Sequence, residues 1–173
     1  MNKRLEKNVS AFIEKSGNIV KNYDSEVFKI NIGYGLLKIE SPIEQIFKIA
    51  FETVIRLLKD DIDVSKYLIS HQVKIGRYII DFIVYDKRKN KKGKYRKVIA
   101  VECDGHDFHD KNKQQRIYEK TRDRYLQSKG LKVLHYTGTE IVQNPYFVAS
   151  EVFGFLDKEI SIENLMEAIN CYG

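Results

Sequence analysis

Two apolar runs of strand length, each carrying an acidic residue, constrain the fold of this sequence more than any other feature. The first run extends from Arg77 to Tyr85 and is interrupted by Asp81, and the second extends from Val98 to Cys103 and includes Glu102. Continuous apolar residues of this length predict strands that are covered on both faces of a sheet. A carboxylate in such a strand is costly unless it is paired or binds a cation. The two acids therefore mark candidate functional positions.

Further elements are predicted on both sides of these strands. Ser41 as an N-cap, Pro42 in the first turn and Glu44 three residues after the cap predict a helix through Leu58. The other predicted elements are a helix near 5–17, a weak strand or irregular segment at 23–37, a strand at 71–75 that turns at Gly76, a helix at 112–128, a strand at 131–136, and helices at 147–156 and 162–169. This order is typical of an α/β fold with a mixed sheet between helices.

The chain of 173 residues fits one compact domain with a short extension. We expect an N-terminal extension at 1–40, a core domain at 41–156 and a helical tail at 157–173 packed on that domain. The 2 cysteines form neither a disulfide framework nor a zinc cluster. No apolar run approaches the roughly 18 residues of a membrane helix, and the first residues lead into no apolar secretory segment. We therefore expect a cytoplasmic protein with no membrane partner.

Positive charge is concentrated in two segments. The chain has 30 basic and 24 acidic residues. Residues 86–97 contain eight basic residues and one acid, and residues 111–132 contain eight basic residues and two acids. Segregated positive charge is typical of proteins that bind a polyanion, because each neutralised phosphate releases condensed counterions. The alternative, for either segment taken alone, is a solvated lysine-rich surface.

The acids near the strand ends predict a cation site. Asp81 and Glu102 lie on strands that a hairpin would make adjacent, and the backbone carbonyl of Cys103 offers a third oxygen. Two carboxylates and a carbonyl, completed by water, suit Mg²⁺, with Mn²⁺ as a substitute. Such a cation polarises a phosphate and lowers the pKa of bound water. A solvent-facing edge strand at Asp81 and an ordinary Asp-Gly turn at Asp104 are the alternatives.

Several short motifs occur in a fixed order between residues 41 and 156. They are Ser41-Pro42-x-Glu44, Gln72 ahead of Asp81-Phe82, Val101-Glu102-Cys103-Asp104-Gly105 with His106 and His109, Arg122-Asp123 with Leu126, Gly130-Leu131-Lys132-Val133-Leu134, and Thr137 with Pro145. As a set they resemble the PD-(D/E)XK nuclease superfamily, in particular the branch related to the very short patch repair (Vsr) endonucleases. The resemblance implies a restriction-endonuclease-like core: an α/β fold with a central mixed sheet of four to five strands flanked by helices.

The resemblance also implies roles for the acids. Asp81 and Glu102 match the metal ligands of the superfamily, and Glu44 matches an accessory acid on the first helix. Asp104 stands where many members have a lysine that orients the attacking water. The chain therefore departs from the superfamily pattern at Asp104, although an aspartate is common there in this branch.

Histidines and basic residues are the remaining candidates. His109 matches the histidine of a Gly-x-x-aromatic-His element and is the candidate for water activation or phosphate contact, with His106 as the alternative. The candidate nucleic-acid contacts are Gln72, Lys87, Arg88, Lys89, Lys91, Lys92, Lys94, Lys113, Gln114, Arg116 and Arg122. On the second basic segment, arginine and lysine could supply the positive charge that Asp104 does not.

Together these features predict a Mg²⁺-dependent endonuclease that hydrolyses phosphodiester bonds, with DNA expected from the resemblance. No other cofactor is expected, and a homodimer or a partner protein is left open. The first alternative keeps the fold without catalysis, as a nucleic-acid-binding module or a subunit of a defence, repair or mobile-element complex. The second alternative is a protein-interaction domain that does not bind nucleic acid.

Overall fold

The computed structural model describes residues 9, 11–16, 36, 39–58, 63–105, 113–157 and 161–172. The chain divides into two compact units, residues 65–139 and residues 1–64 with 140–173, which we call the sheet unit and the helical unit. Apart from residue 36, the weak strand or irregular segment predicted at 23–37 lies outside the described residues. Among the helices described, none is long and apolar enough to cross a membrane.

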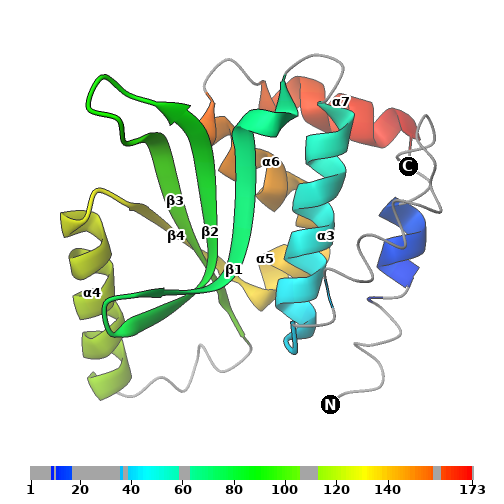
Figure 1. The fold of residues 1–173 in the computed structure, drawn as a ribbon. Coiled ribbons are helices and arrows are strands. Elements are labelled where there is room, and N and C mark those ends of the chain that lie inside the picture. Colours follow the sequence, from blue (N-terminus) through cyan, green and yellow to red (C-terminus); the bar gives the residue numbers. More distant parts are fainter. Residues whose placement is uncertain are drawn as a thin grey trace. The chain divides into compact units, whose positions relative to one another are not determined.

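The sheet unit contains one four-stranded mixed sheet in the order β1-β2-β3-β4 (Figure 1). Its elements are β1 (Tyr67–Ile75), β2 (Tyr78–Lys89), β3 (Tyr95–Asp104), α4 (Lys113–Ser128) and β4 (Lys132–Thr137), preceded by a 3₁₀ turn, η1 (Val64–Lys66). β1, β2 and β3 pair antiparallel, whereas β4 runs parallel to β3. This architecture confirms the predicted α/β fold class with a mixed sheet.

One face of the sheet packs against α4. A buried cluster joins Tyr78 and Ile80 of β2, Ala100 of β3 and Leu126 of α4. Leu126 is the residue of this otherwise polar helix that is fully buried. The packing places the middle and end of α4 over the face of β3 that carries even-numbered residues, the face on which Glu102 also lies.

Gly76 forms the turn between β1 and β2. Its φ of 61° lies in the left-handed region, and a Cβ atom there would come 2.5 Å from the Tyr125 hydroxyl oxygen of α4. Both observations require glycine at this position. The turn predicted at Gly76 is therefore confirmed, and it packs closely against α4.

β2 and β3 form a longer hairpin than predicted. Strand structure extends into the lysine-rich segment between the two predicted strands, because β2 continues to Lys89 and β3 begins at Tyr95. Asn90 closes the turn: its Oδ1 accepts hydrogen bonds from the backbone N–H groups of Lys92 and Lys94 at 2.9 and 3.2 Å. This side-chain cap holds the basic tip in a defined turn.

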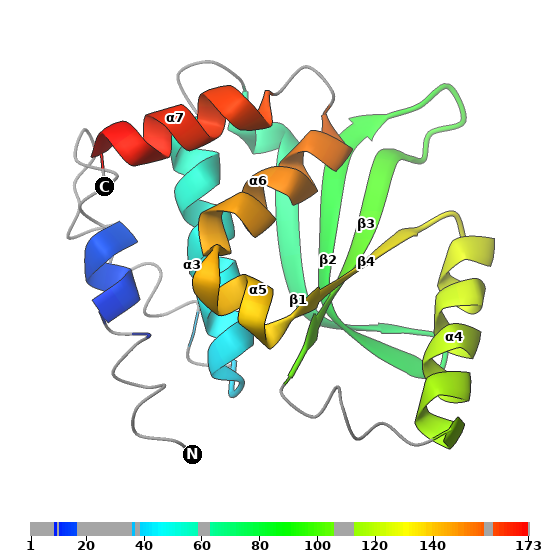
Figure 2. The same ribbon diagram turned by 180° about the vertical axis from the view of Figure 1, so that it is seen from behind.

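The helical unit contains three main helices, and Figure 2 shows α6 alongside α3 and α7. These are α3 (Pro42–Leu57), α6 (Pro145–Leu156) and α7 (Ile162–Tyr172), with residues 11–16 also helical and a short α5 (Gly138–Gln143) directly after β4. The predicted N-cap is confirmed, since Ser41 Oγ accepts from the Glu44 backbone N–H at 3.5 Å. The rings of Phe51 and Phe153, 4.5 Å apart and stacked, connect α3 to α6.

Candidate functional site

Asp81 lies where β2 departs from regular strand geometry. Residues two apart share a face of a regular strand. Tyr78 and Ile80 nevertheless pack in the same buried cluster as Ile83, so the alternation shifts by one residue between Ile80 and Ile83. Gln72 stands opposite on β1 with a φ of 49°, and it is the one non-glycine residue with positive φ among those described. The irregular pair Gln72–Asp81 therefore sets the local direction of the acid.

Two hydrogen bonds hold the carboxylate of Asp81. Oδ2 accepts from the backbone N–H of Cys103 on β3 at 2.8 Å, and Oδ1 accepts from Gln72 Nε2 at 3.3 Å. The register of β2 with β3, continued by one position, sets Asp81 opposite Glu102. Directly opposed residues share a face of a sheet. The structure thus brings the carboxylates of Asp81 and Glu102 together on one face.

Glu102 is buried beside α4, at 5% exposure. Arg122 Nη1 donates a hydrogen bond of 3.1 Å to Glu102 Oε2, while Oε1 is buried and has no hydrogen-bond partner among the described residues. Burial, reinforced by the negative charge of Asp81, raises the pKa of Glu102 to about 8 although Arg122 acts to lower it. A charged Glu102 is therefore disfavoured unless a further cation approaches the free oxygen.

His135 of β4 joins two further carboxylates to this cluster. In the parallel register of β3 and β4, His135 is the partner of Glu102. Its Nδ1 lies 3.1 Å from Asp104 Oδ2, and its Nε2 lies 3.1 Å from Asp123 Oδ2 on α4. The hydrogen bond with Asp104 raises the pKa of His135 against the effect of partial burial, and the charge of Asp123 acts in the same direction.

His135 and Asp123 are not among the site residues predicted from the sequence. His135 completes an alternating pattern with Leu131 and Val133, which lie on the face of β4 that packs toward α4. A polar residue at the end of an apolar strand face is the signal that could have identified it. The contact of His135 with Asp104 follows from the register of β3 with β4. The sequence pattern does not predict that register.

Three other predicted catalytic residues do not belong to the described part of the sheet unit. Glu44 belongs to the helical unit, at the start of α3, whereas Asp81, Glu102 and Asp104 belong to the sheet unit. His106 and His109, the candidates for water activation, lie outside the described residues. Gln72, predicted to contact nucleic acid, is exposed, and its Nε2 donates a hydrogen bond of 3.3 Å to Asp81 Oδ1.

The predicted nucleic-acid contacts on the basic hairpin are mostly exposed lysines. Five of its predicted contacts are exposed: Lys87, Lys89, Lys91, Lys92 and Lys94. Arg88 differs, because its Nε and Nη2 atoms donate to Oδ1 and Oδ2 of Asp86 at 2.8 Å each, and Asp86 is fully buried. Arg88 therefore neutralises a buried acid, whereas the five exposed lysines remain available for a polyanion.

The predicted contacts on α4 also divide into two groups. Lys113, Gln114 and Arg116 are exposed on the first turns of the helix. Arg122, two turns later, is 12% exposed at its side chain and pairs with Glu102. It therefore places a positive charge inside the acidic cluster rather than on the outer surface.

Two carboxylates of the sheet unit, those of Asp81 and Glu102, could bind a divalent cation together with water. Across the ranges that the structure describes, no group of three or more His, Cys, Asp and Glu side chains is arranged to bind a metal by itself. Asp81 and Glu102 are adjacent, and Glu102 has a buried oxygen without a hydrogen-bond partner. Two carboxylates with a carbonyl and water are the ligands that Mg²⁺ commonly uses.

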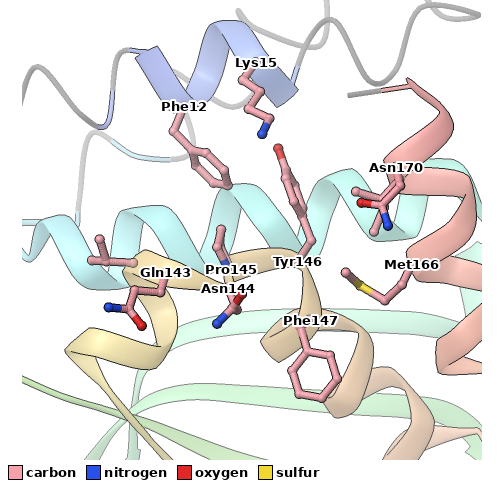
Figure 3. A pocket seen from close by; sticks show the side chains of 11 residues that line it. Phe12, Lys15, Gln143, Asn144, Pro145, Tyr146, Phe147, Met166 and Asn170 are labelled. Carbon is pink, nitrogen blue, oxygen red and sulfur yellow. The ribbon is translucent and has the colours of Figure 1, made fainter.

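A pocket of about 320 Å³ lies in the helical unit, between the N-terminal helical residues, the start of α6 and α7 (Figure 3). Its walls are aromatic, aliphatic and amide side chains with Lys15 at one side, and the Tyr146 hydroxyl is 2.9 Å from Ser16 Oγ. None of the described lining residues is an acid, a histidine or a cysteine. The acidic cluster of the sheet unit, rather than this pocket, therefore carries the groups for hydrolytic chemistry.

Residues 51–156 match the family model REase_MTES_1575, which describes restriction endonuclease-like proteins. The matched region contains the complete sheet unit, and with it Asp81, Glu102, Arg122 and His135. No curated protein and no solved structure gives a match.

Proposed function

Since the chain belongs to the restriction endonuclease-like family REase_MTES_1575, we propose that it is a metal-dependent endonuclease that hydrolyses phosphodiester bonds of DNA. One observation carries the proposal: Asp81 and Glu102 face each other across β2 and β3, and one buried oxygen of Glu102 has no hydrogen-bond partner among the described residues. Two adjacent carboxylates in a largely apolar sheet are costly. A divalent cation between them would remove that cost.

In this proposal Asp81, Glu102 and the backbone carbonyl of Cys103 hold Mg²⁺ or Mn²⁺. When bound, the cation polarises the scissile phosphate and lowers the pKa of a coordinated water. The carboxylate of Asp81 is already oriented in the absence of a metal, because it accepts hydrogen bonds from the Cys103 N–H and from Gln72 Nε2.

In our proposal, Arg122 supplies the positive charge of the superfamily lysine, whose position is occupied by Asp104 in this chain. Its guanidinium is 3.1 Å from Glu102 and 12% exposed, so it is a desolvated positive charge beside the candidate ligand. An arginine can contact a phosphate through two parallel N–H groups, and negative charge that develops on phosphate oxygens is stabilised by such a donor. His109, or His106, is proposed to orient the attacking water.

The exposed lysines of the β2–β3 hairpin are proposed to bind the DNA backbone. Lys87, Lys89, Lys91, Lys92 and Lys94 are exposed, whereas Arg88 pairs with the buried Asp86. The Asn90 turn holds the two strand ends that carry these lysines in one hairpin. Phosphate contacts of this kind position DNA without reading its sequence. Kinship with the very short patch repair branch remains part of the proposal, as does the choice of DNA over RNA.

A plasmid cleavage assay tests the proposal. Purified protein should nick supercoiled plasmid in Mg²⁺ or Mn²⁺, and Asp81→Ala and Glu102→Ala should each abolish the nicking. Glu167→Ala, at an exposed acid of α7, is the matched control and should cleave like the wild type. Calorimetry with Mn²⁺ alone should show binding that both site variants lose. Cleavage that survives in Asp81→Ala would reject the assignment.

A binding module without catalysis is the second candidate. Two observations favour it: Asp104 stands in the place of the superfamily lysine, and Arg122 already pairs with Glu102. This candidate predicts retention of DNA, with no nicking in either metal and no Mn²⁺ binding by the wild type.

A further inference from the structure

Acidic and basic side chains alternate around the candidate site. Glu102 accepts a hydrogen bond from Arg122, and the Nε of Arg122 lies 3.6 Å from Asp123 Oδ1. The other carboxylate oxygen of Asp123, Oδ2, lies 3.1 Å from His135 Nε2. The chain of contacts closes at Asp104, two residues after Glu102, whose Oδ2 is 3.1 Å from His135 Nδ1. β3, β4 and α4 each contribute to this chain, so it links all three elements at the carboxyl ends of the parallel strands.

Both ring nitrogens of His135 take part in these contacts. Each ring nitrogen meets a carboxylate oxygen, an arrangement in which both nitrogens donate when the ring is an imidazolium. The ring is carried by a strand in register with Glu102, and its side chain is 31% exposed. The histidine thus connects a fixed strand to a residue of α4.

Asp123 depends on this contact for its position. Its Oδ1 is buried without a hydrogen-bond partner within the described part of the chain, and so is the Nε of Arg122 that it faces. The bond from His135 to Oδ2 therefore holds the carboxylate that faces Arg122. A displaced Asp123 would leave the guanidinium with a single anchor, Glu102.

We propose that His135 is a positioning residue of the candidate nuclease site: it holds Asp123, and through Asp123 it keeps the guanidinium of Arg122 on Glu102. The inference rests on the proposed function for its effect on catalysis, whereas its effect on Arg122 requires neither metal nor DNA. Residues that support a site in this way are worth about 10- to 100-fold in activity. Partial exposure of His135 makes substitutions there tolerable for folding.

Three substitutions of His135 separate its two contacts. Glutamine places an amide nitrogen near the position of Nε2 and retains the bond to Asp123, whereas asparagine places one near Nδ1 and retains the bond to Asp104. Alanine removes both bonds. We expect kcat for plasmid cleavage to fall about 10- to 100-fold in His135→Ala and His135→Asn. His135→Gln should recover most of kcat, and KM for DNA should change little in all three.

Asp123→Asn provides an independent variant of the second contact. Because His135 acts through Asp123, this change should add nothing to the loss already present in His135→Ala, which a double-mutant cycle measures. Equal losses in the glutamine and asparagine variants, or additive losses in the cycle, would overturn the inference.

Nitrogen-15 NMR of the arginine side chains tests the same contact in the metal-free protein. The Nε–H of Arg122 should give a slowly exchanging signal in the wild type and in His135→Gln, and a rapidly exchanging one in His135→Ala and Asp123→Asn. An unchanged signal in His135→Ala would refute the positioning role even if the wild type cleaves DNA. The expected NMR pattern in a protein that cleaves nothing would instead refute the proposed function and leave the contact established.

Discussion

The backbone N–H of Cys103 donates a 2.8 Å hydrogen bond to Oδ2 of Asp81 and so joins an acidic side chain of β2 to the peptide backbone of β3. Strand pairing of β2 with β3 ends at Phe82, one residue before this contact. The carboxylate thus continues the connection between the strands where backbone pairing ends. It also keeps the charge of Asp81 beside Glu102, where this charge helps to raise the pKa of Glu102.

Asp81→Asn should lower the pKa of Glu102. The amide oxygen can still accept from the Cys103 N–H, but the negative charge that raises the pKa of Glu102 is gone. Because burial is the larger cause, the pKa should fall from about 8 and stay above its ordinary value. Carbon-13 NMR titration of the Glu102 carboxyl measures this, and an unchanged pKa would show that the two charges do not interact. Asp63→Asn, on an exposed acid, is the control.

Glu102→Gln should change how stability depends on pH. The folded-state pKa of Glu102, about 8, is above the unfolded value of 4.5, so its contribution to stability is complete below pH 4.5 and is lost as the pH rises through 8. Glutamine does not titrate. The unfolding free energy of the wild type should therefore fall relative to the variant by on the order of a few kcal/mol across this window.

Denaturant unfolding of both proteins at several pH values, without divalent cations, measures that difference. A difference that is constant with pH would contradict the raised pKa. Adding Mn²⁺ should restore stability to the wild type alone at the upper end of the window, because ligands that bind the folded state stabilise it.

Neutralising the hairpin lysines should reduce the salt dependence of DNA binding. Each lysine that contacts a phosphate contributes about −0.9 to the slope of log K against log salt concentration. Replacing Lys89, Lys91 and Lys92 together with glutamine should therefore make the slope shallower by about 2 to 3. Fluorescence anisotropy with duplex DNA measures the slope, and the same three positions changed to arginine are the control. An unchanged slope would remove the hairpin from the DNA interface.

Arg88→Gln should behave differently from its lysine neighbours. Because Arg88 pairs with the fully buried Asp86, its loss leaves a buried charge without its partner. Such losses cost about 3 to 5 kcal/mol, although the partial exposure of Arg88 reduces this figure. Thermal unfolding should show a clear loss of stability. A stable variant with weakened DNA binding would instead place Arg88 on the interface.

Gly76→Ala should destabilise the sheet unit. Alanine is strained at a φ of 61°, and its Cβ would lie 2.5 Å from the Tyr125 hydroxyl oxygen, which must then move. We expect a loss of about 1 to 3 kcal/mol by denaturant unfolding. Gly105→Ala is the control and should change stability little, because the new Cβ would meet no atom within 4 Å among the described residues beyond its chain neighbours. Equal effects at both glycines would contradict this account.

Local sequence signals were sufficient to predict most elements of the fold and to single out Asp81 and Glu102 as candidate site residues. Apolar runs predicted β2 and β3, the Ser41 cap predicted the start of α3, and Gly76 predicted the first turn, because these signals act within a few residues of the chain. The lengths of β2 and β3 were underestimated, since cross-strand pairing and the Asn90 turn extend strand structure into a lysine-rich segment of low strand propensity.

The contacts between charged side chains could not be predicted from local sequence and are seen in the tertiary structure. Arg122 contacts Glu102 from 20 residues away, and His135 contacts Asp104 from 31 residues away. Periodicity specifies the face on which a residue lies, but the register of β3 with β4 and the packing of α4 on the sheet decide its neighbours. These contacts follow from the packing of α4 on the apolar face of the sheet, which involves residues far apart in the sequence. A local pattern of residues therefore does not predict them.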